Sequence, residues 1–299
     1  MKLQTQRWID RWAGQALCAL VSLWARFFST GPTPAMPEAP RHILVILLSE
    51  MGSVVLAGPM FAALRQSYPD ATIHVLQLKK NQEVAKLLGL AQPAHLHAID
   101  DSAGLGLVRD IWRVSRALRC LTLDAVIDCE LFSRISSLLS YLSGAPLRVG
   151  FTPHTQEGLY RGSFINRAIP YNPYQHISKQ FLSLVDALES TAMPRNKAAP
   201  IRELPTDTAL AVPFESAELS AYQQKLHRDH PSLASRQVVL LYAGGGLLPE
   251  RAWPVSYYAE IARGLCAAGH AVGLIGLRDD AALAHDLCQQ VGHAACVDL

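Results

Sequence analysis

The chain has 299 residues, of which 50% are hydrophobic and 17% charged, a balance typical of a globular protein and not of a disordered chain. This length exceeds what one hydrophobic core usually holds and favours two domains. The 27 basic and 25 acidic residues give a net charge of +2, which offers no sign of a nucleic-acid partner.

Six cysteines are spread over the chain without a C-x-x-C pair. This spacing argues against a disulfide framework and a structural zinc site, and it favours reduced core thiols in a cytoplasmic protein. The six are Cys18, Cys120, Cys129, Cys266, Cys288 and Cys296.

Residues 7–28 have the pattern of an amphipathic helix. Polar side chains recur at three- and four-residue steps, from Arg7 and Arg11 to Ser22 and Arg26, and a wide apolar face rich in tryptophan, leucine and phenylalanine covers the rest. The uncharged run 17–25 is shorter than the roughly 20 residues that cross a bilayer, whereas tryptophan and arginine along one helix suit the headgroup region. We expect this helix to lie on the cytoplasmic face of a membrane. The alternatives are an uncleaved signal peptide and a packed, domain-swapping helix.

Residues 29–41 are rich in proline and have the composition of a semi-extended linker, so residues 1–41 precede the folded body. Residues 42–192 then alternate strand and helix patterns. Strands are expected from Ile43 and at 72–77, 95–99, 123–129 and 147–151, with helices at 82–88, 105–118, 132–142 and 177–188. This alternation predicts a parallel sheet with helices on both faces. Residues 152–175 lack strong periodicity and are expected to form a long loop.

The first strand passes into a helix through a polar stretch that includes Ser49, Glu50, Gly52 and Ser53. Such a loop lies at the carboxyl edge of a parallel sheet, where ligands bind near helix N-termini. Glu50 is the one carboxylate in this stretch, which makes it the first candidate for chemistry.

A proline-rich stretch at 193–205 marks the predicted start of a second α/β domain, residues 193–299. Strand patterns near Leu210 and at 238–242, 271–275 and 295–299 alternate with helix patterns at 215–229, 255–268 and 281–291. The sequence stops on a strand. We therefore expect this domain to be incomplete and to expose a sheet edge.

Several motifs in a fixed order resemble glycosyltransferase family 9, the heptosyltransferases of lipopolysaccharide assembly. They are L-S-E-M-G-S-V-V-L-A-G-P from residue 48, Asp128 at a strand end, Phe132-Ser133-Arg134 at a helix start, G-A-P-L-R-V-G-F at 144–151, and G-G-G…R-A-W-P at 244–254. The resemblance covers residues 42–299. It implies a GT-B architecture, in which one Rossmann-like domain binds the acceptor and the other the nucleotide-sugar.

The resemblance also implies the reaction. A heptose or related sugar would pass from an ADP-sugar to a lipopolysaccharide-type or other lipid-linked acceptor, with inversion and without a metal, and the nucleotide-sugar would be a substrate with no separate cofactor. The protein would then be cytoplasmic and peripheral on the inner face of the bacterial inner membrane.

Two positions depart from the family pattern. The family usually has an aspartate after the loop glycine, where it resembles the catalytic base, and this chain has Ser53 there. An Asp-Ser-Gly…His segment that helps to hold the donor has no match before residue 299, which suggests a truncated sequence. A serine hydroxyl cannot act as the base unaided, so we expect Glu50 to take that role and Ser53 to cap the next helix. The alternative is that Glu50 is a solvated loop charge.

The predicted donor site lies in the second domain. Glycines after a strand let a diphosphate approach the backbone, and an arginine pairs well with phosphate oxygens. The candidates are Gly244, Gly245, Gly246 and Arg251. The alternatives are an ordinary tight turn for the glycines and a surface cation for Arg251, and we expect Trp253 to be a packing residue.

The predicted acceptor site lies in the first domain. Ser49 and Gly52 belong to the loop after the first strand, and Arg134 and Arg148 could meet anionic groups of a phosphorylated acceptor. His176 opens a helix and is either a ligand or a capping neighbour. Structural roles for the two arginines are the alternative.

No metal site is expected. His95 and His97 have no third ligand at usable spacing. Asp128 and Glu130 form an acid-x-acid pair like the metal pair of other glycosyltransferases, but the resemblance argues against a metal. Two functions remain open: a membrane-associated glycosyltransferase, and a non-catalytic truncated or degenerate relative that acts as a binding or scaffold protein.

Overall fold

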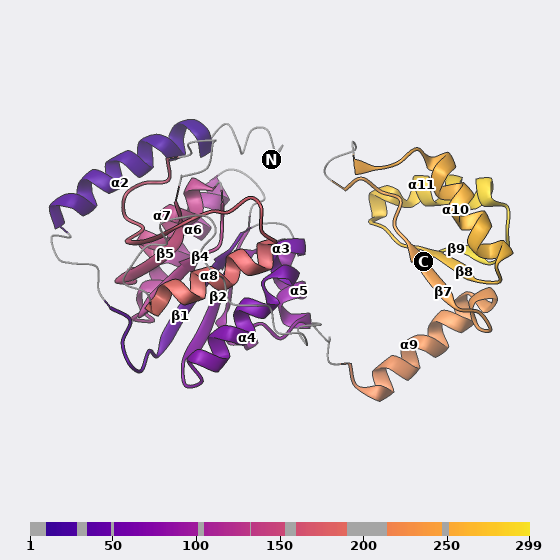
Figure 1. The fold of residues 1–299 in the computed structure, drawn as a ribbon, viewed down its shortest axis with the longest axis horizontal. Coiled ribbons are helices and arrows are strands. Elements are labelled where there is room, and N and C mark those ends of the chain that lie inside the picture. Colours follow the sequence, from indigo (N-terminus) through magenta and orange to yellow (C-terminus); the bar gives the residue numbers. More distant parts are fainter. Residues whose placement is uncertain are drawn as a thin grey trace. The chain divides into compact units, whose positions relative to one another are not determined.

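The computed structural model describes residues 10–28, 35–48, 51–100, 105–131, 133–152, 160–189, 214–246 and 251–299. Figure 1 shows that they belong to two compact units, Met1–Pro213 and Phe214–Leu299. Residues 190–213 lie outside the described residues. The boundary expected at residue 193 and the strand expected near Leu210 fall there and stay predictions.

The first unit is built on a six-stranded parallel sheet in the order β3-β2-β1-β4-β5-β6. Its strand β1 is apolar and buried from Ile43 to Leu47 because helices cover both faces of the sheet. The strands are β1 (His42–Leu47), β2 (Thr72–Leu78), β3 (Leu96–Ile99), β4 (Ala125–Asp128), β5 (Leu147–Thr152) and β6 (Arg167–Pro170).

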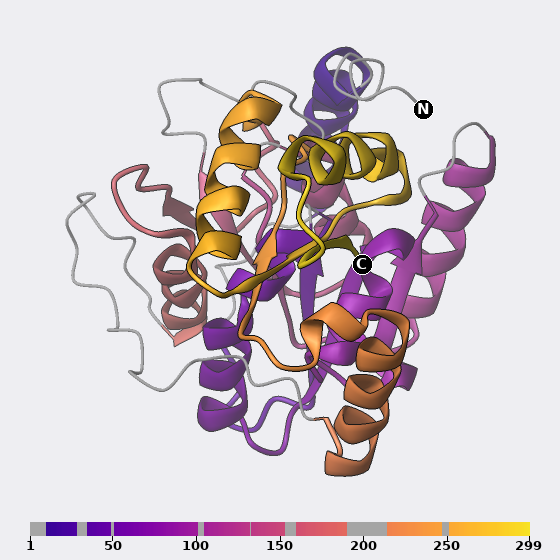
Figure 2. The same cartoon turned by 90° about the vertical axis from the view of Figure 1, so that its right-hand side faces the viewer.

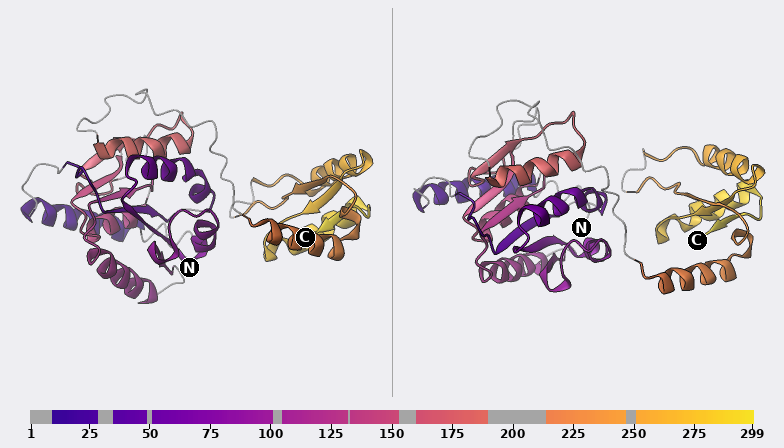
Figure 3. Two further views of the ribbon diagram at one scale, coloured as in Figure 1. Left: turned by 90° about the horizontal axis from the view of Figure 1, so that it is seen from below. Right: turned by 60° about the horizontal axis from the view of Figure 1, so that its bottom comes forward.

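Two apolar cores separate along β1, as the two-residue period of a strand requires. Ile43, Val45 and Leu47 pack with one set of helices: α3 (Met51–Leu56), α4 (Gly58–Ser67), α5 (Gln82–Leu87) and α8 (Ile177–Glu189). Leu44 and Ile46 pack with α6 (Leu105–Arg119) and α7 (Arg134–Leu142). The predicted doubly wound α/β fold is confirmed, and Figure 3 shows the sheet between the helices from two further sides.

One expectation for the first unit is wrong. Residues 152–175 contain β6, which pairs in parallel with β5 from Val149↔Arg167 to Thr152↔Pro170. The sequence gives little sign of this strand, because it has only four residues, ends in a proline and has just one well-buried residue. His95 also differs from expectation, since it belongs to the 3₁₀ turn η3 (Pro93–His95) and not to β3.

The expected N-terminal helix is present over the described part of residues 7–28. It consists of the π-helical turn η1 (Asp10–Gly14) and α2 (Gln15–Phe28), at the outside of the first unit (Figures 1 and 3). No helix among the residues that the structure describes is long and apolar enough to cross a membrane.

The second unit has a parallel sheet in the order β7-β8-β9. The strand β8 (Ala271–Leu274) is fully buried between its neighbours β7 (Val238–Leu241) and β9 (Cys296–Asp298). The helices, coloured orange to yellow in Figure 2, are α9 (Ser216–Asp229), α10 (Val255–Ala267) and α11 (Ala281–Val291). Small residues of α10, including Ala259 and Ala262, let this helix pack closely in the core.

Candidate functional site

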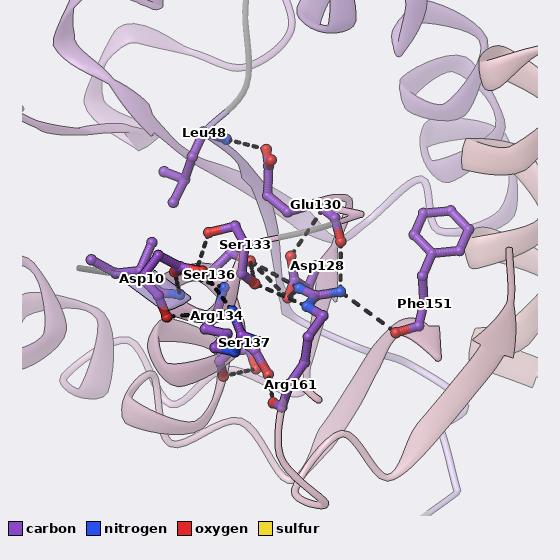
Figure 4. Close-up of polar contacts among 12 residues, drawn as sticks. Asp10, Leu48, Asp128, Glu130, Ser133, Arg134, Ser136, Ser137, Phe151 and Arg161 are labelled. Carbon is purple, nitrogen blue, oxygen red and sulfur yellow. Dashed lines mark hydrogen bonds and ion pairs between the residues drawn. The ribbon is translucent and has the colours of Figure 1, made fainter. Parts of the chain in front are cut away.

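The candidate site of the first unit lies at the carboxyl ends of β1 and β4. In the order of the sheet, β2 and β3 follow outward from β1 toward one edge, whereas β5 and β6 follow outward from β4 toward the other edge. The connections therefore diverge between β1 and β4, and this switch point is where open α/β sheets bind ligands. Figure 4 shows that polar side chains from the end of β4, from the start of α7 and from Arg161 converge here, and that Glu130 reaches the backbone N–H of Leu48 at the end of β1.

A buried ion pair forms the centre of this site. Asp128 ends β4 and is 0% exposed, and its Oδ2 accepts from Nη2 of Arg161, which is 2% exposed. Arg161 also donates from Nε to the carbonyl of Ser133 at 2.9 Å and from Nη1 to the carbonyl of Glu130 at 2.6 Å. Burial raises the pKa of the Asp128 carboxyl, while Arg161 and the N–H of Glu130 act to lower it. The several N–H donors of one guanidinium explain how Arg161 joins Asp128 to the carbonyls of Glu130 and Ser133 at both ends of this turn.

Glu130 links β4 to the end of β1. Its Oε1 accepts the backbone N–H of Leu48 at 2.7 Å, and the residue is only 7% exposed (Figure 4). Leu48 immediately precedes Ser49 and Glu50 in sequence. Glu130 therefore fixes the point at which the candidate catalytic loop leaves the sheet.

The N-terminus of α7 is capped twice. Ser133 accepts the N–H of Ser136 through its hydroxyl at 3.4 Å, and Asp10 accepts the N–H groups of Arg134 at 3.0 Å and Ile135 at 3.3 Å through one carboxylate oxygen. A carboxylate at this position also suits the positive end of the helix. The serine hydroxyl of Ser136 in turn donates to Asp128 at 3.1 Å, so α7 and the ion pair are one network.

The structure describes only part of the predicted loop. Ser49 and Glu50 lie outside the described residues. Gly52 and Ser53 belong to α3, where Gly52 is exposed and a Cβ on it would meet nothing within 4 Å. The expectation that Ser53 caps the following helix is wrong, because α3 already begins at Met51.

The other predicted acceptor residues have structural partners. Arg134 is 5% exposed and donates to the carboxylate of Asp10 at 3.2 Å and to the carbonyl of Tyr160 at 2.9 Å. Arg148 donates to the carbonyls of Phe164 at 2.6 Å and Ala145 at 2.7 Å. These contacts agree with the alternative prediction, in which both arginines have structural roles.

His176 is exposed and precedes α8. Its Nδ1 accepts the N–H of Ser178 at 3.3 Å, and its carbonyl accepts the N–H of Gln180 at 3.2 Å. This is the geometry of a helix cap, the alternative to a ligand role.

The predicted donor residues of the second unit follow β7. Gly246 has φ +60°, a left-handed conformation that glycine adopts without strain, and Gly244 and Gly245 lead to it from the strand. Arg251 is exposed, shortly before α10. Trp253 is 58% exposed, and its ring stacks on Tyr258 with centroids 5.7 Å apart. An arginine, an exposed indole and a helix start thus follow the glycines in sequence.

Arg161 has no signal in the sequence, and Glu130 stands out there only as part of an acid-x-acid pair like a metal pair. Arg161 lies in a stretch without periodicity, so nothing in the sequence connects it to Asp128. Within the described ranges no group of three His, Cys, Asp or Glu residues is placed to hold a metal ion.

A row of histidines lies on the face of the sheet that α6 covers. The Nδ1 of His42 lies 3.1 Å from Nε2 of His74, whose Nδ1 lies 3.2 Å from Nε2 of His97, and His95 packs edge-on against His74 at 4.8 Å. His74 is 2% exposed. Burial, helped by the neighbouring imidazoles, lowers the pKa of His74 to about 4, so it is neutral at pH 7.

Two units of parallel strands and covering helices, with polar groups at the carboxyl edges, define a protein of the Rossmann-like α/β class. The sequence pattern of "Glycosyltransferase family 9 (heptosyltransferase)" matches residues 111–299. The chain therefore belongs to glycosyltransferase family 9, and the predicted family is confirmed.

Individual relatives are distant. The chain is 22% identical over 250 residues to lipooligosaccharide heptosyltransferase 2 of Haemophilus ducreyi (strain 35000HP / ATCC 700724), a match that covers 82% of this chain and 66% of the relative. This chain thus spans just under two thirds of that relative's length.

Solved structures share the fold. A family 9 glycosyltransferase from Veillonella parvula DSM 2008 superposes with a TM-score of 0.65 at 19% identity, covering 86% of this chain and 68% of that one. The E. coli ADP-heptose lps heptosyltransferase II gives a TM-score of 0.64 at 19% identity, covering 84% and 70%. The predicted pair of Rossmann-like domains is confirmed by this likeness.

Proposed function

We propose that the protein is a glycosyltransferase that moves a heptose or related sugar from an ADP-type nucleotide-sugar to a lipopolysaccharide-type acceptor. The family match over residues 111–299 carries this proposal, and the relatives named for heptose transfer give it a substrate class. Transfer with inversion and without a metal is part of the proposal. So is a peripheral location on the cytoplasmic face of the inner membrane, where a lipid-linked acceptor would be available.

The first unit would position the acceptor and its base. Transfer requires a base to take the proton of the attacking hydroxyl. We assign this role to Glu50, because Ser53 stands where the family pattern has its aspartate. Glu130 supports the assignment as a positioning residue, since it holds the N–H of Leu48 at the start of the same loop.

The second unit would hold the donor. The departing diphosphate needs N–H groups and positive charge, and Gly244, Gly245 and Gly246 with Arg251 can supply both. The left-handed Gly246 supports a tight turn that opens the backbone to a phosphate. Trp253 at the start of α10 is exposed enough to contact a nucleotide, although sequence analysis treated it as a packing residue.

Titration calorimetry of the full chain tests donor binding, with ADP, UDP and their sugars as probes. We expect ADP to bind, and Arg251→Ala to weaken it about tenfold or more, as loss of a charge-assisted phosphate contact predicts. Arg228→Ala, which removes an exposed arginine of α9, is the matched control and should bind ADP as the native chain does. If no nucleotide binds, the donor assignment fails.

A transfer assay tests the base. Glu50→Gln should abolish sugar transfer without changing ADP affinity, because it removes proton acceptance and keeps the shape of the side chain. Glu38→Gln, at an exposed acid of the linker, should leave transfer unchanged. Transfer that survives in Glu50→Gln would assign the base to another residue.

The second candidate function is a non-catalytic binding or scaffold protein. The observation that favours it is Ser53, whose hydroxyl cannot replace a carboxylate base. Binding of nucleotide-sugar without turnover in the native chain would support this reading over the enzyme.

A further inference from the structure

The helix α2 buries its small residues and exposes its large apolar ones. An amphipathic helix that only packs on its own domain does the reverse. The residues that η1 and α2 bury are small: Gly14, Cys18, Ser22 and Ala25. The large apolar residues are 49–72% exposed: Trp12, Leu17, Leu20, Leu23, Trp24 and Phe27. A helix that served only to cover the domain would bury the large residues and expose the small ones.

Several specific contacts hold the small-residue side on the first unit. The hydroxyl of Ser22 accepts from the hydroxyl of Tyr160 and from the N–H of Ser163, both at 2.9 Å. Cys18 and Ala25 pack with Phe164 in a small core of their own. At the start of η1, Asp10 caps α7 and pairs with Arg134 at 3.2 Å. This side of α2 is therefore a fitted interface, and the exposure of the other side is not the result of loose packing.

The exposed side forms one continuous face. At 3.6 residues per turn, Leu20, Leu23 and Phe27 point away from Cys18 and Ser22. We call these three residues, with Trp12, Leu17 and Trp24, the outer face of α2. Isolated exposed apolar residues are ordinary, but a contiguous set along one helix marks a surface that meets a partner.

The charge around this face favours an anionic lipid surface over a protein partner. Residues 1–28 contain four basic residues, Lys2, Arg7, Arg11 and Arg26, and one acid, Asp10. Asp10 is already paired with Arg134, while Arg11 and Arg26 are exposed. Tryptophan and arginine beside an apolar helix face are typical of helices that lie at the boundary between headgroups and acyl chains.

We propose that the outer face of α2 docks on an anionic phospholipid bilayer and holds the first unit there in one orientation. Because Asp10 caps α7, which follows the carboxyl end of β4, the docked helix starts beside the edge that we assign to the acceptor. A tether on a proline-rich linker would leave this orientation free, whereas the contacts of Ser22 and Asp10 fix it. The inference rests on α2 alone, so it can hold or fail independently of sugar transfer.

Flotation of the full chain with vesicles tests the proposal. Vesicles of phosphatidylethanolamine with phosphatidylglycerol should bind the protein, and vesicles of phosphatidylcholine alone should bind it more weakly. Leu20→Glu with Leu23→Glu should lower the partition coefficient at least about tenfold, because two buried acyl-chain contacts become charges. The matched control is Leu219→Glu with Tyr222→Glu, two exposed residues of α9, and it should bind like the native chain.

Three results would overturn the proposal. The first is that the native chain and the α2 variant bind vesicles equally well. The second is that the α9 control loses as much vesicle binding as the α2 variant. The third is that the native chain binds neither kind of vesicle. Circular dichroism and thermal unfolding confirm that both variants fold. Sedimentation velocity tests the main alternative, in which a second copy of the chain covers the outer face. If the native chain is a dimer that does not bind vesicles and the α2 variant is a monomer, the outer face is a dimer interface.

Discussion

At the carboxyl ends of β1 and β4 a buried carboxylate and a buried guanidinium form an ion pair, whereas toward the amino ends of β1 and β2 burial and neighbouring histidines lower the pKa of the His74 imidazole to about 4. Asp128 and Arg161 satisfy each other and gather further hydrogen bonds from Ser136 and the turn. Among the described residues, the ring partners of His74 are His42, His95 and His97. The ion pair should lose its stabilising effect when either partner is removed. The histidine row should become destabilising when the pH falls and His74 must take up a proton.

The largest expected effect comes from Arg161→Met. This change leaves Asp128 buried without its cation, which should lower the unfolding free energy of the first unit by about 3–5 kcal/mol. Urea denaturation followed by circular dichroism measures it. Arg109→Met, at an exposed arginine of α6, is the control and should cost less than about 0.5 kcal/mol.

The double variant Arg161→Met with Asp128→Asn sharpens this result. Removing both charges takes away the unpaired buried carboxylate, so the double variant should regain part of the loss. If the single and double variants are equally unstable, the ion pair does not account for the stability at this end of the sheet.

The next largest effect is the pH dependence set by His74. Its pKa is about 4 in the folded chain and about 6.5 in the unfolded chain, so below pH 6.5 the unfolded chain binds a proton that the folded chain excludes. Stability should fall progressively between about pH 6.5 and 4, by up to about 3 kcal/mol. Urea midpoints at pH 7.5, 6.0 and 4.5 measure the slope.

His74→Leu tests whether this slope belongs to the histidine row. The variant should flatten the decline, because Leu44 and Leu76 already line the same face and no proton is excluded. His285→Leu, at an exposed histidine of α11, should leave the slope unchanged. An undiminished slope in His74→Leu would move the pH dependence to other groups.

A smaller effect is expected at Glu130. Glu130→Leu leaves the N–H of Leu48 without its acceptor and should cost about 1–3 kcal/mol. Glu130→Gln keeps an acceptor oxygen and should cost less. Equal losses for the two variants would show that the charge of Glu130, and not its contact with Leu48, stabilises this end of the sheet.

The smallest effect concerns Asp10. Asp10→Ala removes a carboxylate cap from α7 and the ion-pair partner of Arg134. Because Ser133 still caps the helix and Arg134 keeps the carbonyl of Tyr160, the change should cost about 0.5–2 kcal/mol. In the native chain the N–H groups of Arg134 and Ile135 donate hydrogen bonds to Asp10. Hydrogen exchange at these two amides should therefore be faster in the variant. Exchange that rises equally in the middle of α7 would indicate loss of the whole helix and not of its cap.

The sequence predicts most of the fold, because a parallel strand covered on both faces is an apolar run that few other structures produce. The helix expected at 281–291 has the bounds of α11, and the strand expected at 238–242 differs from β7 by one residue. β6 was missed since an edge strand of four residues lacks such a run. Ser53 was misplaced because a residue that can cap a helix can also lie in its first turn.

The candidate site was predicted less completely. The strand-end acid Asp128 is visible in the sequence, but its partner Arg161 comes from a stretch without periodicity. Asp10 appears only as the one acid in a basic helix, and nothing local indicates that it caps α7. Contacts between residues far apart in the chain are set by the packed sheet, so a pattern of short range cannot reveal them.

The pairing of Asp10 with α7 has a consequence for how the chain is made. The contact joins residues 124 positions apart, and Ser163, which holds Ser22, follows later still. During synthesis from the N-terminus, α2 therefore emerges long before its place on the first unit exists. The apolar residues that it buries therefore stay uncovered until the sheet and α7 have formed, which makes the docking of α2 a late step in the folding of the first unit.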